Sequence, residues 1–423
     1  MSRNKLIVLA LIGAAVGNSW AAAPSTARRR PARPRPSPLV WHVETLDGTV
    51  LESSSGDEPI NPASVVKVAT ALWALERLGP SQRFETRVGR HGTLDPAKGV
   101  LAGDLLVLGG ADPDFHVQNA FLVADALNRA GVREVQGKLL VDDAFWIGWE
   151  GGSEHREPDP AKRAQGMASR LRAVLDPALW TRPTRGAWWR FAAEHAMIPG
   201  KPPRVSIRGG VGVRGTTAPD SVLLVHRSNE LGQILKRFAA FSNNDIERLE
   251  PSLGPPSFLA SHVQQVSGIS APAIELQTLS GLGTNRMTPR QVVGLLRELR
   301  RSCERHGLRV GDVLPTAGCD PGTLRAFARL DTGPVARCVV GKTGTLTSTD
   351  GGISVLAGFA STVKGELLFC VAVPRSGIRP GRARWTEDRW VEELILRNGG
   401  PRALACAAPV GRSDDRAEVL AAP

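Results

Sequence analysis

The chain has 423 residues, of which 42% are hydrophobic and 22% are charged, so it can bury a large core and is expected to form a catalytic domain with a second lobe. Its formal net charge is +12, but +2 comes from Arg3 and Lys5 and +5 from arginines between residues 24 and 38, leaving +5 elsewhere. Because most of this excess lies outside the expected fold and no recognition motif accompanies it, the composition argues against a nucleic-acid-binding module.

Residues 1–23 have the pattern of a secretory signal peptide. A basic start precedes an apolar run from Leu6 to Val16, and small residues follow it. The run is too short to span a bilayer comfortably, so we expect cleavage and a periplasmic or other extracytoplasmic location. The next segment, residues 24–38, is a Pro/Arg-rich linker. It is expected either to make peripheral contact with anionic wall or membrane polymers or to have no partner, and both alternatives stay open.

Two elements are predicted directly after the linker. Residues 39–46 and 49–51 flank Asp47-Gly48, which predicts a β-hairpin. Apolar residues then recur at helical spacing from Ala69 to Leu78, until Gly79-Pro80 ends the pattern.

Ser64 and Lys67 fall in the first turn of this helix and share one face. The unpaired N–H groups and the positive dipole end favour a developing anion there, and they ease the loss of a proton from Lys67. A neutral lysine beside a serine hydroxyl is an activated nucleophile. The Ser-x-x-Lys spacing alone is weak evidence, because it also occurs at Ser2 and Ser361 and a solvated lysine near a helix start would show it too.

Residues 84–220 are expected to form an inserted, mostly β lobe. Short strands and Gly/Asp loops alternate as far as Trp146, with a helix predicted near 123–130 and a strand at 138–141. The region from Gly148 to Gly215 is polar and poorly periodic. The peptidase domain would therefore have a first part at 39–83 and a second part at 221–399.

The second part combines helices with an antiparallel meander. A helix is predicted to end at Ser242-Asn243-Asn244, and another to start at Thr288-Pro289, with Thr288 as its N-cap. Strands are predicted at 338–346, 353–360 and 367–373, followed by a covering helix at 386–397. Residues 400–423 are Ala/Pro-rich and are expected to form a frayed C-terminal tail.

The five cysteines allow at most two disulfides and leave one free thiol. They are Cys303, Cys319, Cys338, Cys370 and Cys406. Cys370 lies inside an apolar strand and is the expected buried free thiol. The spacings fit no zinc pattern, so we expect no metal and no cofactor. Asp112, Asp114 and His116 are interpreted as loop residues and not as ligands.

Three motifs occur in order along the chain: Ser64-x-x-Lys67, Ser242-x-Asn244 and Lys342-Thr343-Gly344. This combination is the signature of penicillin-binding proteins and class A β-lactamases. The chain resembles the D-alanyl-D-alanine carboxypeptidase/endopeptidase family, the class C low-molecular-mass penicillin-binding proteins (peptidase family S13), from about residue 39 to residue 398. Further stretches similar to that family are Gly103 to Pro113, Ser280-Gly281-Leu282, Leu314-Pro315, Gly322-Thr323-Leu324 and Leu356 to Phe359.

The resemblance implies an α+β fold, in which an antiparallel sheet covered by helices carries an inserted lobe. It also implies that Ser64 is the acylated nucleophile and Lys67 its proton acceptor, while Ser242 and Asn244 relay protons and hold the substrate amide. The reaction would be hydrolysis of the D-Ala-D-Ala bond of peptidoglycan stem peptides, and β-lactams would acylate Ser64.

The same resemblance implies the substrate-binding residues. Lys342 and Thr343 would meet the terminal carboxylate, and Gly344 would permit close backbone approach. The N–H groups of Ser64 and Thr345 would form the oxyanion hole. Gly283-Thr284 and Thr347 depart from the family pattern near the stem-peptide side chain, so preference for a diaminopimelate substrate stays open. The 178 residues between Ser64 and Ser242 imply that the innermost inserted domain is reduced or absent.

Two alternatives share these motifs. A secreted serine β-lactamase usually carries a Glu-x-x-Leu-Asn loop for deacylation, but Leu127-Asn128 has Ala124 at the required place. A non-catalytic peptidoglycan-binding homologue would keep the fold without turnover, and the presence of all the motif residues argues against it.

Overall fold

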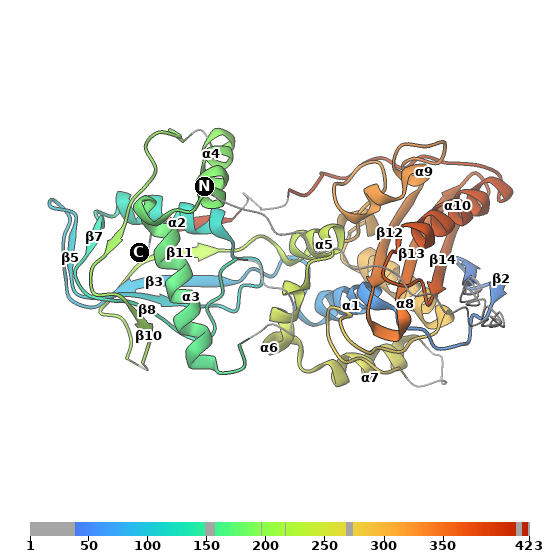
Figure 1. The fold of residues 1–423 in the computed structure, drawn as a ribbon, viewed down its shortest axis with the longest axis horizontal. Helices are drawn as coiled ribbons and strands as arrows, with labels where there is room; N and C mark the ends of the chain where they lie inside the picture. Colours follow the sequence, from blue (N-terminus) through green and yellow to red (C-terminus); the bar gives the residue numbers. More distant parts are fainter. Residues whose placement is uncertain are drawn as a thin grey trace, which may run out of the picture. The chain divides into compact units, whose positions relative to one another are not determined.

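The computed structural model describes residues 39–148, 157–195, 197–215, 217–267, 274–411 and 417–421. The predicted signal peptide and linker, residues 1–38, lie outside the described residues. Within the described ranges, no helix combines the length and the apolar character needed to cross a membrane. The strands of these ranges form three sheets, of five, six and four strands (Figure 1).

The five-stranded sheet carries the third motif and has the order β12-β13-β14-β1-β2. Its strands are all antiparallel to their neighbours. Their bounds are β1 Val40–Thr45, β2 Val50–Ser54, β12 Val339–Leu346, β13 Ile353–Thr362 and β14 Gly365–Pro374. The predicted hairpin and meander are therefore confirmed, and β1 joins them by pairing with β14.

Helices cover both faces of this sheet, which explains why β14 is apolar at successive positions. Leu367, Phe369 and Val371 share a core with residues of α10 (Gly381–Arg397), which lies over β13 and β14 (Figure 1). Leu368, Cys370 and Ala372 share another core with α1 (Val66–Leu78) and α8 (Pro289–Arg305). The covering helix begins at Gly381, earlier than the predicted residue 386.

The other helices of this domain follow the predicted pattern. Thr288 caps α8 by accepting a hydrogen bond from the Gln291 N–H at 3.1 Å, and Pro289 is its first residue, as predicted. α5 (Leu231–Phe241) ends at Ser242, also as predicted. The remaining helices are η1 Ala63–Val65, η4 Asn244–Leu249, α6 Glu250–Leu253, α7 Pro256–Ser267, η5 Val310–Asp312, η6 Thr323–Ala326, α9 Ala328–Asp331 and η7 Thr349–Gly351.

The chain between α1 and α5 builds a hydrophobic core of its own. Its strands are β3 Glu85–Arg90, β4 Thr93–Asp95, β5 Val100–Ala102, β6 Leu105–Leu108, β7 Glu134–Val135, β8 Leu139–Val141, β9 Ser206–Ile207, β10 Val211–Val213 and β11 Ser221–Arg227. Its helices are α2 Val117–Arg129, α3 Pro160–Leu175, η3 Pro177–Leu179 and α4 Arg182–Glu194. We propose that this inserted lobe extends to Arg227 and not only to residue 220, because β11 pairs with β3.

The lobe is richer in helix than the sequence analysis predicted. α3 and α4 occupy the stretch that was interpreted as poorly periodic. Both begin with recognisable caps, since Asp159 accepts hydrogen bonds from two backbone N–H groups of α3 and Thr181 accepts one from α4. The buried residues of α3 do recur at helical spacing in the sequence: they are Ala164, Met167, Ala168, Leu171, Val174 and Leu175.

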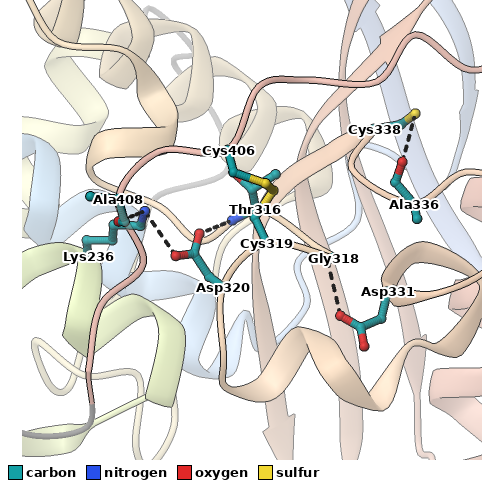
Figure 2. Close-up of a disulfide and its surroundings, with 10 residues drawn as sticks. All are labelled: Lys236, Thr316, Gly318, Cys319, Asp320, Asp331, Ala336, Cys338, Cys406 and Ala408. Carbon is teal, nitrogen blue, oxygen red and sulfur yellow. Dashed lines mark hydrogen bonds and ion pairs between the residues drawn. A yellow bond between two sulfur atoms is a disulfide. The ribbon is translucent and has the colours of Figure 1, made fainter.

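The described residues of the C-terminal tail, 400–411 and 417–421, are anchored at several points, whereas a frayed tail was expected. A disulfide joins Cys406 to Cys319, and the Lys236 Nζ donates to the Ala408 carbonyl at 3.1 Å (Figure 2). Lys236 also pairs with Asp320 at 3.0 Å. β15 (Glu418–Ala421) then adds to the lobe's sheet beside β11.

The three remaining cysteines, Cys303, Cys338 and Cys370, are buried free thiols. The prediction for Cys370 is therefore confirmed, although two further thiols are free as well.

Candidate active site

Ser64 lies in a strained turn at the entrance to α1. Its neighbour Ala63 has a φ of 48°, a left-handed conformation that costs energy for a residue with a Cβ. Asn61 stabilises this turn, because its Oδ1 accepts the Ala63 N–H at 3.0 Å and its Nδ2 donates to the Gly283 carbonyl at 2.9 Å. The turn leaves the half-buried Ser64 at the start of the helix, as the sequence predicted.

Lys67 is only 2% exposed, and its Nζ has three hydrogen-bond partners. It lies 3.1 Å from Ser64 Oγ, 2.9 Å from Asn244 Oδ1 and 2.7 Å from the Ser280 carbonyl oxygen. Two of these partners only accept hydrogen bonds, whereas the serine hydroxyl can donate one. A neutral amine, with two N–H groups and one lone pair, satisfies all three and leaves the lone pair for the Ser64 proton.

Burial favours this neutral form. It lowers the pKa of Lys67 from 10.5 to about 7, against the opposing effect of the Glu247 carboxylate. Glu247 Oε1 also accepts the Ser280 N–H at 3.1 Å, so the same carboxylate fixes the loop whose carbonyl accepts from Lys67.

The second motif lies where α5 ends and η4 begins. Ser242 adopts a left-handed conformation with a φ of 53°, which terminates α5. Asn243 then caps η4, with its Oδ1 accepting the Asp245 N–H at 2.9 Å. Ser242 Oγ accepts from Lys342 Nζ at 2.9 Å, and Asn244 Oδ1 accepts from Lys67. Ser242 is therefore the C-cap of α5, and Asn243 caps the start of the helix that follows.

The third motif lies on β12, which runs beside the Ser64 turn. Lys342 is fully buried, and its Nζ also donates to the Thr343 carbonyl at 2.6 Å. The pKa of Lys342 is lowered well below its usual value, mainly by burial and to a smaller extent by the charge of Lys67. At Gly344 a Cβ would lie 2.7 Å from the Pro62 carbonyl oxygen, so only glycine allows the strand to approach the turn this closely.

The three motifs meet at a cavity of about 250 Å³. Among its lining residues are Ser64, Ser242, Thr343, Thr345, Thr323 and Arg384. Both predicted serines and both predicted threonines therefore face one space. Lys67, Asn244 and Lys342 are not among its lining residues. Lys67 contacts the Ser64 hydroxyl and Lys342 the Ser242 hydroxyl, while Asn244 contacts Lys67.

The sequence analysis assigned no role to several residues of this site. Ser280 and Thr323 lie in stretches that already resembled the family, and Thr323 Oγ1 lies 2.7 Å from Thr343 Oγ1. Glu247 and Arg384 had no sequence signal, because their positions depend on tertiary contacts. Arg384 lies before the predicted start of its helix.

The lobe contacts the segments on either side of the second motif. Asp114 is ion-paired with Arg237 of α5, and both side chains are buried. Arg248 of η4 donates to the Gly148 carbonyl at 2.7 Å. Asp114 also bonds His116 at 3.1 Å, so this loop serves packing, as expected. Within the described ranges, no three acidic, His or Cys side chains are grouped so that they could hold a metal ion.

Comparisons with known proteins agree with this geometry. The D-Ala-D-Ala carboxypeptidase 3 (S13) family model matches residues 39–167 and 203–390. A D-alanyl-D-alanine carboxypeptidase from Actinomadura sp. (strain R39) is 26% identical over 418 residues, covering 78% of this chain and 76% of the relative.

Solved structures share the fold at lower identity. A penicillin G-acylated predatory endopeptidase from Bdellovibrio bacteriovorus, in complex with an immunity protein, has a TM-score of 0.72 at 23% identity, covering 90% of this chain and 99% of that chain. Penicillin-binding protein 4 from Haemophilus influenzae has a TM-score of 0.62 at 17% identity, covering 86% of this chain and 97% of that chain. The family model covers well over half of the chain, so the chain belongs to the D-Ala-D-Ala carboxypeptidase 3 (S13) family, the serine-type class C penicillin-binding proteins.

Proposed function

We propose that this chain hydrolyses the D-Ala-D-Ala bond of peptidoglycan stem peptides through an acyl-enzyme on Ser64. The contact that carries the proposal is the 3.1 Å distance between Lys67 Nζ and Ser64 Oγ. The other two partners of Lys67 are acceptors, so the lone pair of the neutral amine points to the serine proton.

The first half of the reaction forms the acyl-enzyme. Lys67 takes the proton of the Ser64 hydroxyl as Oγ attacks the carbonyl carbon of the penultimate D-alanine. The N–H groups of Ser64 and Thr345 stabilise the oxyanion of the tetrahedral intermediate. When the C–N bond breaks, Lys67 returns the proton to the departing amine. Ser242 lines the same cavity, but its hydroxyl accepts a hydrogen bond from Lys342 and not from Lys67.

The second half releases the product. A water molecule replaces the departed D-alanine and attacks the ester carbonyl, while the neutral Lys67 accepts its proton. The ester bond to Ser64 breaks, and the proton returns to Ser64 Oγ. Both half-reactions need Lys67 to be neutral at their start.

Substrate binding follows from the same cavity. Thr343 and Thr345 line the space where the leaving D-alanine would lie. Asn244, which the family resemblance assigns to the substrate amide, accepts a hydrogen bond from Lys67. The buried Lys342 donates a hydrogen bond to Ser242 Oγ and thereby polarises that hydroxyl. Peptidoglycan endopeptidase activity, as named for the Bdellovibrio relative, would use the same residues and is the second candidate activity.

The cellular location follows from the substrate. Peptidoglycan lies outside the cytoplasmic membrane, and the signal-like residues 1–23 support export. We therefore propose that the mature enzyme acts in the periplasm or another extracytoplasmic space.

The test is mass spectrometry after incubation with benzylpenicillin, followed by peptide mapping. We expect a lasting adduct on Ser64, which Ser64→Ala abolishes without unfolding the protein. Ser361→Ala is a matched control, because Ser361 belongs to the other Ser-x-x-Lys pair within the described ranges and should leave labelling intact. Hydrolysed penicillin without an adduct would favour the β-lactamase, and intact penicillin without an adduct would favour the non-catalytic homologue.

A further inference from the structure

Arg384 is the one basic residue among the described residues that line the active-site cavity. It lies in the first turn of α10, and its Nη2 donates to Thr345 Oγ1 at 3.2 Å. Thr345 belongs to the strand that carries the third motif. The guanidinium is therefore fixed beside the hydroxyls of that strand.

Neither motif lysine presents an ammonium group to this cavity. Lys67 and Lys342 are 2% and 0% exposed, and their donors are used by Ser64, Asn244, Ser242 and two backbone carbonyls. Burial lowers the pKa of both, and the charge of Lys67 opposes protonation of Lys342. A substrate carboxylate in the cavity thus needs another cation.

The charge of Arg384 is not neutralised by the residues around it. Within the described part of the chain it forms no ion pair, whereas Arg389 and Arg397 of the same helix pair with Glu393 and Glu52. The nearest acid along α10 is the fully buried Glu387, whose Oε2 accepts from Ser354 Oγ at 2.7 Å. Burial raises the pKa of Glu387 well above its usual value, which favours its uncharged form.

The helix itself gives no electrostatic reason for an arginine at this position. The first turn of a helix carries the positive end of its dipole and disfavours a cation. Acidic residues are absent from the first turn of α10. An anion bound in the cavity would offset this repulsion.

We propose that Arg384 binds the free α-carboxylate of the leaving D-amino acid, together with the hydroxyls of Thr343 and Thr345. This inference rests on the proposed function and adds the residue that recognises the C-terminal carboxylate of the substrate. A guanidinium presents parallel N–H donors that match the two carboxylate oxygens, so it recognises the planar group and not only its charge. In this arrangement the buried Lys342 donates a hydrogen bond to Ser242, and Arg384 binds the substrate carboxylate.

The experiment compares two peptides that differ at one group. One ends in D-Ala-D-Ala with a free carboxylate, and the other carries a C-terminal amide. We expect Arg384→Met to lower kcat/KM for the free carboxylate by about 30-fold, as for loss of a charge-assisted hydrogen bond, with little change for the amide. Arg384→Lys should restore part of the loss, because it keeps the charge without the planar fork.

Arg382→Met is the matched control. It removes the same charge from the same first turn, but Arg382 is exposed and does not line the cavity. Its kcat/KM for both peptides should match that of the parent enzyme. Retained amide cleavage, or a thermal midpoint equal to that of the parent, shows that Arg384→Met is folded.

The possible failures are distinguishable. A parent enzyme that neither cleaves the free peptide nor forms the Ser64 adduct would reject the proposed function. The role of Arg384 alone would be rejected if the parent is active and either of two results is found. In one, Arg384→Met lowers kcat/KM by the same factor for both peptides; in the other, it leaves kcat/KM for the free carboxylate unchanged.

Discussion

Lys342 Nζ lies 2.9 Å from Ser242 Oγ, although 100 residues separate them in the chain. The other end of the same short motif, Asn244, accepts from Lys67. The Ser-x-Asn segment therefore separates the two buried lysines and gives each one a partner. Both contacts depend on the position of this segment directly after the end of α5.

The pH dependence of acylation reports the protonation of Lys67. Because burial lowers its pKa from 10.5 to about 7, the neutral base is the minor form below that pH and the major form above it. The second-order rate of Ser64 acylation by benzylpenicillin should rise with pH through about 7 and then level. In Lys67→Arg the side chain stays charged, so the second-order rate of acylation should fall by roughly 10²–10⁴-fold. A flat profile from about pH 5 to 9 would reject Lys67 as the base.

Gly344→Ala should separate β12 from the Ser64 turn. The added Cβ would lie 2.7 Å from the Pro62 carbonyl oxygen and 3.1 Å from the Ala63 Cβ. We expect a loss of about 1–3 kcal/mol in the free energy of unfolding, with acylation slowed more than tenfold. Gly166→Ala in α3 is the control, since nothing lies within 4 Å of its Cβ and alanine should stabilise that helix slightly. Equal acylation rates in both variants would show that the close approach is not needed.

The buried Asp114–Arg237 pair should stabilise the contact between the lobe and α5. Burial raises the pKa of Asp114, but the Arg237 charge and hydrogen bonds outweigh it, so the net pKa is lowered. Asp114→Asn or Arg237→Met should each cost about 3–5 kcal/mol in urea unfolding, because each removes one member of a buried ion pair. The double variant should cost less than the sum of the two.

Arg227→Met provides the control for this pair. Its ion pair with Glu85 lies at the surface and should contribute only about 0–1 kcal/mol. Strict additivity of the two buried substitutions would contradict the coupling.

The Cys319–Cys406 disulfide should stabilise the protein by closing a long loop. The two residues are 87 positions apart, and a bridge of this span typically contributes about 2–4 kcal/mol. Cys406→Ser should lower the unfolding midpoint, and a reductant should lower the midpoint of the parent but not of the variant. If the unfolding midpoint of the parent does not change after verified reduction, the other contacts of the tail are enough to maintain its stability.

Local pattern predicted much of the catalytic domain. The Asp47-Gly48 hairpin, the Thr288-Pro289 helix start and the three-stranded meander occur as expected, because turn chemistry, capping and alternation act between near neighbours. The helices α3 and α4 of the lobe were not predicted, although the buried residues of α3 recur at helical spacing. The tail, rich in Ala and Pro, has no local signal for the disulfide or for β15.

The chemical groups of this protein can be identified from its sequence: a serine with a lysine one helical turn away, and two further motifs that match one family. How those groups act on one another depends on tertiary contacts. Burial lowers the pKa of Lys67, the Ser-x-Asn segment gives each buried lysine a partner, and α10 brings Arg384 to a cavity whose other residues lie far from it in the chain. These effects arise from desolvation and from contacts across long separations, which no local pattern encodes.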